Sequence, residues 1–284
     1  MDGTENIEYF IVDNLNKNEN SKSLSNFNVY LNTNKFMSSI NTNKLYQVAI
    51  DNVSFFNTIW NINSYNNILN VFEIRFDLPS SFNTSVIIPK GVYDITQLLS
   101  ALTTQLNTVK QASGTYLFSL IGGLVNLTYT PLGPEVWNFN LSVNPFNPPT
   151  ALINQEFKDL LGYFNDLGVG PSATAPNAYN LFWNQNCIYL QSNIVNFNTP
   201  LAGEIQAPNP LNQTVYVVAI SKPSFTYIHQ ESFTLKYFSA LAQPFRKLVN
   251  FRITDRLGND VEGLNEFTFQ LLVKQLPPQN IVAQ

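Results

Sequence analysis

The sequence predicts an all-β protein, an antiparallel sandwich or barrel with two short helices. Short runs of alternating apolar and polar residues fill most of the chain, and such a period of two is typical of strands with one buried face. Clusters of Asn, Ser, Gly and Pro separate these runs. The runs do not alternate regularly with helices, which argues against a parallel sheet built from βαβ units. The expected strands lie at residues 7–12, 25–32, 45–56, 70–78, 85–89, 115–121, 125–130, 136–143, 187–193, 215–221, 233–239, 248–255 and 266–274.

One segment departs from the strand pattern and predicts a helix at residues 94–106. Asp94 is a good N-cap, Gln97 completes a capping box, and Tyr93 can pack on the first turn as a hydrophobic staple. The apolar residues then recur with helical spacing and fall on one face: Ile95, Leu98, Leu99, Leu102 and Leu106. A second, shorter helix is expected at about residues 155–161, capped by Asn154 and ended by Gly162.

Two glycine-containing turns predict hairpins. Gly122-Gly123 separates two strand-like runs by two residues, as in a tight hairpin. The segment DRLGNDVEG, residues 255–263, is expected to connect the last two strands in the same way.

The ends and the middle of the chain differ in composition. Residues 1–23 are predicted to form an N-terminal arm, because residues 13–23 are polar after a short first strand. Residues 24–284 are predicted to form one β domain, built from about 24–90 and 185–275. An insertion is expected within about 110–186, where prolines and a glycine-rich, asparagine-rich stretch interrupt the strand pattern.

The surface is predicted to be polar but poorly charged. Charged residues make up 12% of the chain, against roughly 25% in an average globular protein. The net charge is −4 and no segment concentrates Lys and Arg, which argues against binding nucleic acid through phosphates. Asparagine, with about 40 residues, supplies much of the polar surface. This excess fits a coding bias toward AT-rich codons, and a low charge also suits a surface buried against neighbouring subunits.

The chain is expected to be made in a reducing cytosol. A single cysteine excludes a disulfide framework within the chain. The N-terminal residues show no secretory signal, and no apolar stretch reaches the roughly 18 residues of a membrane span.

Few residues offer catalytic or metal chemistry. His229, the one histidine, would need a nucleophile such as Cys187 or a serine and an orienting carboxylate, so a structural role is favoured for both residues. The acidic group Asp255, Asp260 and Glu262 lacks the spacing of a calcium loop and is expected to be a solvated turn. We therefore expect no catalytic, cofactor-binding or metal-ligating residue and no enzyme activity. Three tryptophans can stack on sugars as in a lectin, but core or interface positions are favoured: Trp60, Trp137 and Trp183.

Several motifs resemble, in order, those of the penton (minor capsid) proteins of virophages and polinton-like viruses. The first is IPKGVYDITQLL at residues 88–99, an apolar strand that runs through a Pro-Gly-Tyr turn into one amphipathic helix. The other motifs are YQVAIDNVSFFNTIWNINSYNN (46–67), LLGYF (160–164), CIYLQSNIV (187–195) and FRITDRLGNDVEGLNEFTFQLLVK (251–274), the last similar to the final hairpin of the family. The segment 165–186 and the polar residues before 24 depart from the family pattern.

The resemblance implies a jelly-roll subunit that forms homopentamers at the vertices of an icosahedral virion. The implied partners are further copies of the chain, the major capsid protein of the same virion, and a host receptor or giant-virus surface glycan. The implied location is the capsid vertex, after synthesis in the host cytoplasm. The helix would then cover an edge or end of the sandwich. The alternative is a carbohydrate- or receptor-binding β-sandwich of a virus.

Overall fold

The chain folds into two compact units. A computed structural model describes residues 7–31, 46–75, 80–134, 137–141, 155–163, 170–182, 185–194, 214–231, 239–240 and 248–275. Unit 1 combines residues 1–59 and 184–284, and unit 2 is formed by residues 60–183. The inserted part of the chain therefore begins at Trp60, well before the predicted 110, because the strands between Trp60 and Trp183 pair only with one another.

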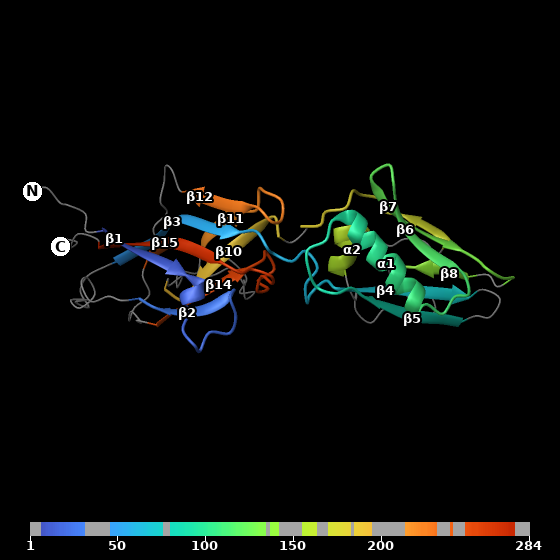
Figure 1. Cartoon of the computed structure of the whole chain (residues 1–284), viewed down its shortest axis with the longest axis horizontal. Coiled ribbons are helices and arrows are strands. Elements are labelled where there is room, and N and C mark those ends of the chain that lie inside the picture. Colours follow the sequence, from blue (N-terminus) through green and yellow to red (C-terminus); the bar gives the residue numbers. More distant parts are fainter. Residues whose placement is uncertain are drawn as a thin grey trace, which may run out of the picture. The chain divides into compact units, whose positions relative to one another are not determined.

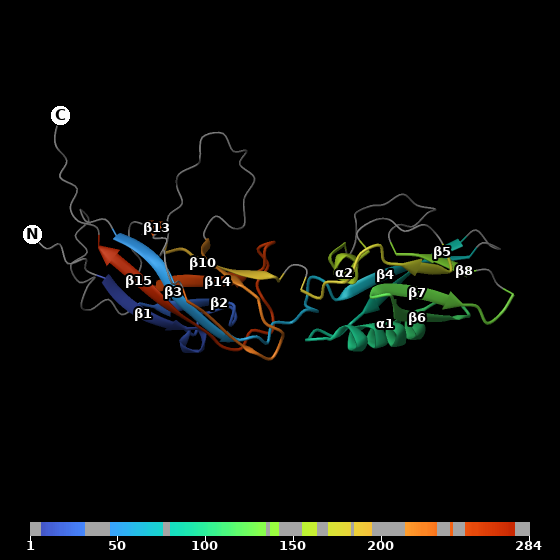
Figure 2. The ribbon, with the colours of Figure 1, turned by 90° about the horizontal axis from the view of Figure 1, so that it is seen from above.

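Unit 1 is a sandwich of two antiparallel sheets. One sheet has the order β1-β15-β3-β12, with β13 also paired to β3, and the other has the order β2-β14-β10-β11. This is the strand order of a jelly roll, and it confirms the predicted all-β antiparallel sandwich. Figure 1 and Figure 2 show β3 beside β15, and β14 beside β2 and β10. The strands are β1 (Ile7–Asp13), β2 (Asn26–Tyr30), β3 (Tyr46–Phe56), β10 (Cys187–Ser192), β11 (Thr214–Ala219), β12 (Tyr227–Glu231), β13 (Ser239–Ala240), β14 (Leu248–Thr254) and β15 (Phe267–Gln275).

The core of unit 1 lies between the sheets and follows from the period of two. On β14, Val249, Phe251 and Ile253 point inward and are nearly inaccessible to solvent. On β3 the inward-facing residues change from even to odd numbers along the strand, because both Ile50 and Val53 belong to this core. A register shift against β15 in this region marks a β-bulge, which allows both halves of the long strand to face inward.

Residues 7–16 belong to the fold, contrary to the predicted arm. β1 pairs with β15 along its whole length, from Ile7 opposite Lys274 to Asp13 opposite Thr268. A short 3-10 helix, η1 (Asn14–Asn16), follows. Asn14 is fully buried; its Nδ2 donates to the Leu24 carbonyl at 2.9 Å, and its Oδ1 accepts from the Phe267 amide at 2.9 Å. One buried amide therefore anchors a segment whose composition resembles a loop.

The predicted final hairpin is wrong. β14 and β15 lie in opposite sheets, so residues 255–266 cross from one sheet to the other. The Gly258 turn exists, but it closes a small local loop in which the Val261 amide donates to the Ile253 carbonyl at 3.0 Å. A turn signal predicts a change of direction, and it does not specify the sheet in which the chain continues.

Unit 2 contains two small antiparallel sheets and both helices. The sheets have the orders β5-β4-β8 and β6-β7-β9. Within the described residues, neither helix is long and apolar enough to cross a membrane. The elements are β4 (Ile68–Arg75), β5 (Ser80–Ile87), α1 (Ile95–Val109), β6 (Thr115–Ile121), β7 (Leu124–Thr130), β8 (Trp137–Asn140), α2 (Gln155–Leu161) and β9 (Ser172–Thr174).

The predicted helix, its cap and its apolar face are confirmed in α1. The Asp94 side chain accepts from the Gln97 amide at 2.8 Å, and Gln97 Oε1 accepts from the Asp94 amide at 3.1 Å, which completes the capping box. The buried leucines of α1 belong to the core of unit 2, so the helix packs within that unit. The buried residues of α1 are Leu98, Leu99, Leu102 and Leu106.

Other sequence predictions have mixed outcomes. The second helix and the Gly122-Gly123 hairpin are present as predicted, whereas the proposed cap Asn154 lies outside the described residues. The strands β9 and β12 were not predicted. Of the predicted strand 233–239, only Ser239 is described.

Candidate assembly surfaces

The first candidate surface, named here the aromatic face, is the outer face of the sheet β1-β15-β3-β12. Inward residues such as Phe55 and Phe269 fill the core, and their neighbours point outward. Apolar outward residues gather on the two edges of this sheet. Tyr9 and Ile11 on β1 are 56% and 79% exposed, and Tyr227 on β12 is 56% exposed beside Phe56.

At the β12 edge of the aromatic face a serine, a histidine and a glutamate are in contact. Ser54 on β3 lies opposite His229 on β12, and Ser54 Oγ is 2.6 Å from His229 Nδ1. The Nε2 atom of His229 is 2.8 Å from Glu231 Oε1. These are the three residue types of a serine hydrolase triad. The sequence indicated a serine as one option but not this serine, because 175 residues separate the two positions.

The setting of this cluster does not suit acyl transfer. The side chains of His229 and Glu231 are nearly half exposed on an open sheet face. A hydrolase stabilises its oxyanion with preorganised donors in a site that excludes water. Because β3 lies between β15 and β12, the amides near Ser54 are committed to the sheet. Cys187 starts β10 in the other sheet, so the structure does not bring it to His229.

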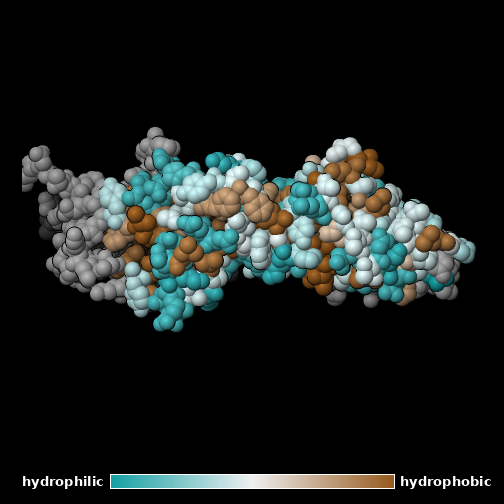
Figure 3. Space-filling view, in the orientation of Figure 1, coloured by the Kyte–Doolittle hydropathy of each residue, from teal (hydrophilic) through white to brown (hydrophobic). Residues whose placement is uncertain are grey.

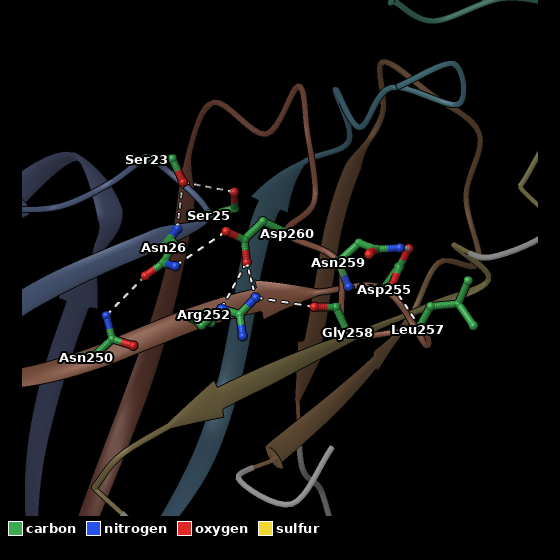
Figure 4. A network of polar contacts seen from close by, with 10 residues as sticks. All are labelled: Ser23, Ser25, Asn26, Asn250, Arg252, Asp255, Leu257, Gly258, Asn259 and Asp260. Carbon is green, nitrogen blue, oxygen red and sulfur yellow. Dashed lines mark hydrogen bonds and ion pairs between the residues drawn. The ribbon is translucent and has the colours of Figure 1, made fainter. Parts of the chain in front are cut away.

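The second candidate surface, named here the asparagine face, is the outer face of β2 and β14 (Figure 4). Asn250 Nδ2 donates to Asn26 Oδ1 at 3.1 Å and to Asn28 Oδ1 at 3.0 Å. Asn26 Nδ2 donates to Asp260 Oδ2 at 3.3 Å. Arg252 binds the other oxygen of Asp260 through Nε and a terminal nitrogen, at 2.9 and 2.6 Å. The face thus carries a polar network around the Arg252–Asp260 ion pair, beside the exposed ring of Tyr30 on β2.

The acidic turn next to this face is held by protein donors. Asp255 Oδ1 accepts from the amides of Leu257 and Asn259 at 2.8 and 2.9 Å, and its Oδ2 accepts from Asn259 Nδ2 at 3.1 Å. Asp260 is occupied by Arg252 and Asn26. Among the described residues, no group of three or more His, Cys, Asp or Glu side chains is placed to hold a metal ion.

Unit 2 contains a buried carboxylate that the sequence did not single out. Glu73 on β4 is fully buried and accepts from the hydroxyls of Thr84 and Tyr116, at 2.5 and 3.0 Å. It also accepts from the backbone amides of Gln111 and Ala112, just after α1, at 2.7 and 3.1 Å. Burial, and secondly the nearby charge of Glu73, raise the pKa of Tyr116 well above its usual range. Four donors around one carboxylate fasten the end of α1 to two sheets, and the contact is structural.

The tryptophans do not form a sugar-binding platform in the described part of the chain. Trp137 is buried, its ring lies 5.9 Å from that of Phe82, and the Arg75 guanidinium lies 5.8 Å from its centre. Trp60 is half-buried, and Trp183 lies outside the described residues.

Comparison with known proteins finds similarity in structure only. No model of a known protein family matches the chain, and no curated protein matches it in sequence. A solved structure similar to this chain is the selenomethionine-labelled penton protein of mavirus, with a TM-score of 0.49 and 11% sequence identity. The match covers 95% of this chain and 100% of that protein.

Proposed function

We propose that the chain is a structural capsid protein, the penton subunit at the vertices of a virophage-type virion. The strand order of unit 1 carries this proposal. Eight strands in two sheets form a jelly roll, an architecture of viral capsid proteins, lectins and cupins. The ordered motifs that resemble the penton family favour the capsid subunit among these three classes.

The two sides of the sandwich suit a closed ring. Chain connections place β1 with β2 on one side and β12 with β11 on the other. The two sides differ, so the contact between copies is head-to-tail, and such contacts close into a ring when the rotation allows. Exposed Tyr9 and Ile11 on one side and Phe56 and Tyr227 on the other supply apolar area for this contact. With few charges, identical copies repel one another weakly.

The proposed partners are four further copies of the chain and the major capsid protein of the same virion. The protein acts at the capsid vertex after synthesis in the host cytoplasm, and its role is structural and not catalytic. The variants His229→Gln and Cys187→Ser should therefore assemble like the wild type. A hydrolase activity lost in either variant, with the fold unchanged, would contradict the structural role.

The test of assembly is a mass measurement by light scattering, alone and beside the major capsid protein. The subunit mass is 32.1 kDa, and the wild type should reach five times this value. Ile11→Asp should give monomers, because it places a charge in the proposed contact. Leu132→Asp is the matched control, since Leu132 is as exposed as Ile11 but lies in unit 2. Monomers under both conditions, or a position away from the vertices in electron micrographs of virions, would refute the proposal.

A second candidate is binding of a receptor glycan, which the exposed aromatic rings of unit 1 favour. Phe225 and Tyr227 are 62% and 56% exposed and lie two residues apart, Phe225 just before β12 and Tyr227 at its start. Aromatic rings stack on sugar faces. A glycan array with the wild type and the Phe225→Ala variant tests this second function. If the protein binds a glycan through this ring, the wild type gives a signal and the variant loses it.

A further inference from the structure

The tip of the β6–β7 hairpin projects freely from unit 2. Ile121 and Leu124 form its last pair, and Gly122 and Gly123 make the turn with φ of 58° and 82°. Only residues that tolerate positive φ fit such a two-residue turn. A Cβ added to either glycine would meet no atom within 4 Å, so the turn stands in open space.

The tip is apolar on both faces of the hairpin. Leu120 and Ile121 are neighbours on one strand, so they point to opposite faces, and they are 41% and 56% exposed. Closer to the base, Phe118, Val125 and Leu127 are buried in the core of unit 2. Figure 3 shows apolar surface at the tip of this hairpin. A firmly anchored hairpin therefore presents bulky apolar side chains at its free end.

The hairpin and its flanking segments carry no charge. Residues 111–134 include no Lys, Arg, Asp, Glu or His. Moving a charged group out of water is costly, whereas an uncharged apolar tip leaves water without that cost. The tip thus combines exposed apolar side chains with an absence of charged groups to desolvate.

We propose that this hairpin tip binds a lipid bilayer by inserting Leu120 and Ile121 between the headgroups and the acyl chains. A flat protein surface can cover only one face of a hairpin, whereas a bilayer surrounds the tip and covers both. Apolar side chains at the boundary of the bilayer give reversible binding without a span. The tip lacks basic residues, so it binds neutral lipid. The proposal is independent of the capsid assignment, although a ring would present several tips and strengthen binding by avidity.

The primary test is flotation of the full chain with vesicles of pure phosphatidylcholine. The wild type should float with the vesicles, equally in low and in high salt. The double variant Leu120→Ser/Ile121→Ser should bind about tenfold more weakly, because binding scales with the buried apolar area. The matched control is Leu132→Ser, which removes a leucine that is 74% exposed at the turn after β7, and it should bind like the wild type. Tryptophan fluorescence checks that each variant keeps a folded unit 2.

A second measurement follows the tip itself. In a Cys187→Ser background, an environment-sensitive dye on Ile121→Cys should brighten with vesicles, and the same dye on Leu132→Cys should not. A wild type that stays unbound, or a double variant that floats like the wild type, overturns the proposal. Loss of major capsid protein binding by the double variant, with no vesicle binding by the wild type, would instead make the tip a protein contact. Light scattering on the same samples reports ring formation separately.

Discussion

Replacing Glu73 by leucine should strongly destabilise unit 2. The carboxylate accepts four hydrogen bonds in a fully buried site, and leucine of similar volume accepts none. The Thr84 and Tyr116 hydroxyls can rotate toward other acceptors, but the amides of Gln111 and Ala112 are fixed by the backbone. Each buried donor without a partner costs about 1–3 kcal/mol.

The two unpaired amides, together with weakened hydrogen bonds of the two hydroxyls, should lower the free energy of unfolding by about 3–5 kcal/mol. Breaking a buried charged contact has a cost in the same range. This is a large part of the roughly 5–15 kcal/mol by which a domain is stable. Glu73→Gln keeps one acceptor oxygen and should cost less, about 1–3 kcal/mol. Thr84→Val is the control: it removes one donor, leaves the fixed amides paired, and should cost about 1 kcal/mol.

Denaturant unfolding followed by tryptophan fluorescence isolates this effect. All three tryptophans, Trp60, Trp137 and Trp183, are assigned to unit 2, and Trp137 is buried in its core, so the emission follows the unfolding of that unit. Circular dichroism follows both units, and its unit 1 transition should stay at the wild-type midpoint. A Glu73→Leu transition within about 0.5 kcal/mol of the wild type, the usual range of neutral surface changes, would refute the structural role of the carboxylate.

Three further predictions concern the same unit. Leu102→Asp puts a charge at a fully buried helix position and should cost several kcal/mol, whereas Thr104→Asp on the exposed face should melt near the wild type; equal melting would show that the helix is not packed. Burial raises the pKa of Tyr116 and Tyr163 above the usual 10.0, so above about pH 10 the unfolded chain releases protons that the folded chain keeps. Stability should be full below pH 10 and fall above it by about 1.4 kcal/mol per pH unit and tyrosine, and a Tyr116→Phe variant with an unchanged slope would contradict this. Gly162→Ala should lower the free energy of unfolding by more than about 1 kcal/mol, because φ is 90° and the new Cβ would meet the Asn177 carbonyl; an unchanged free energy of unfolding would show that this turn relaxes freely.

Local features of the fold were predictable because their causes are local. The cap of α1 needs only Asp94 and Gln97, three residues apart, and the hairpin turn needs only two glycines. A period of two likewise shows that a strand has one buried face. It does not show which sheet the strand joins, since β6 in unit 2 buries every second residue over Tyr116–Phe118 just as β14 in unit 1 does over Val249–Ile253. The start of the insertion and the placement of the last two strands were therefore wrong.

The candidate surfaces were less predictable, because strand register creates them. Ser54 meets His229 only because β12 pairs with β3, and β12 itself was not predicted. Its one buried apolar side chain, Ile228, is too weak a pattern to identify a strand. Arg252 and Asp260 lie close in the sequence, but their contact depends on the fold of the turn between them. The prediction of an N-terminal arm was wrong for a similar reason, since polar composition does not reveal that the side-chain amide of Asn14 is buried.

The asparagine excess has a structural use that coding bias does not explain. Asn61 pairs with both backbone groups of Tyr93, donating to its carbonyl at 2.7 Å and accepting from its amide at 2.9 Å. Asn107 pairs in the same way with Tyr116, at 2.7 and 2.9 Å. A carboxamide carries one donor group and one acceptor, like a peptide bond, so it completes backbone pairing where no strand is adjacent. Aspartate lacks the donor, and glutamine would hold the amide one methylene farther out. Because this pairing adds no charge, the residue that satisfies the buried backbone of unit 2 also keeps the chain poor in charge, as the proposed contacts between copies require.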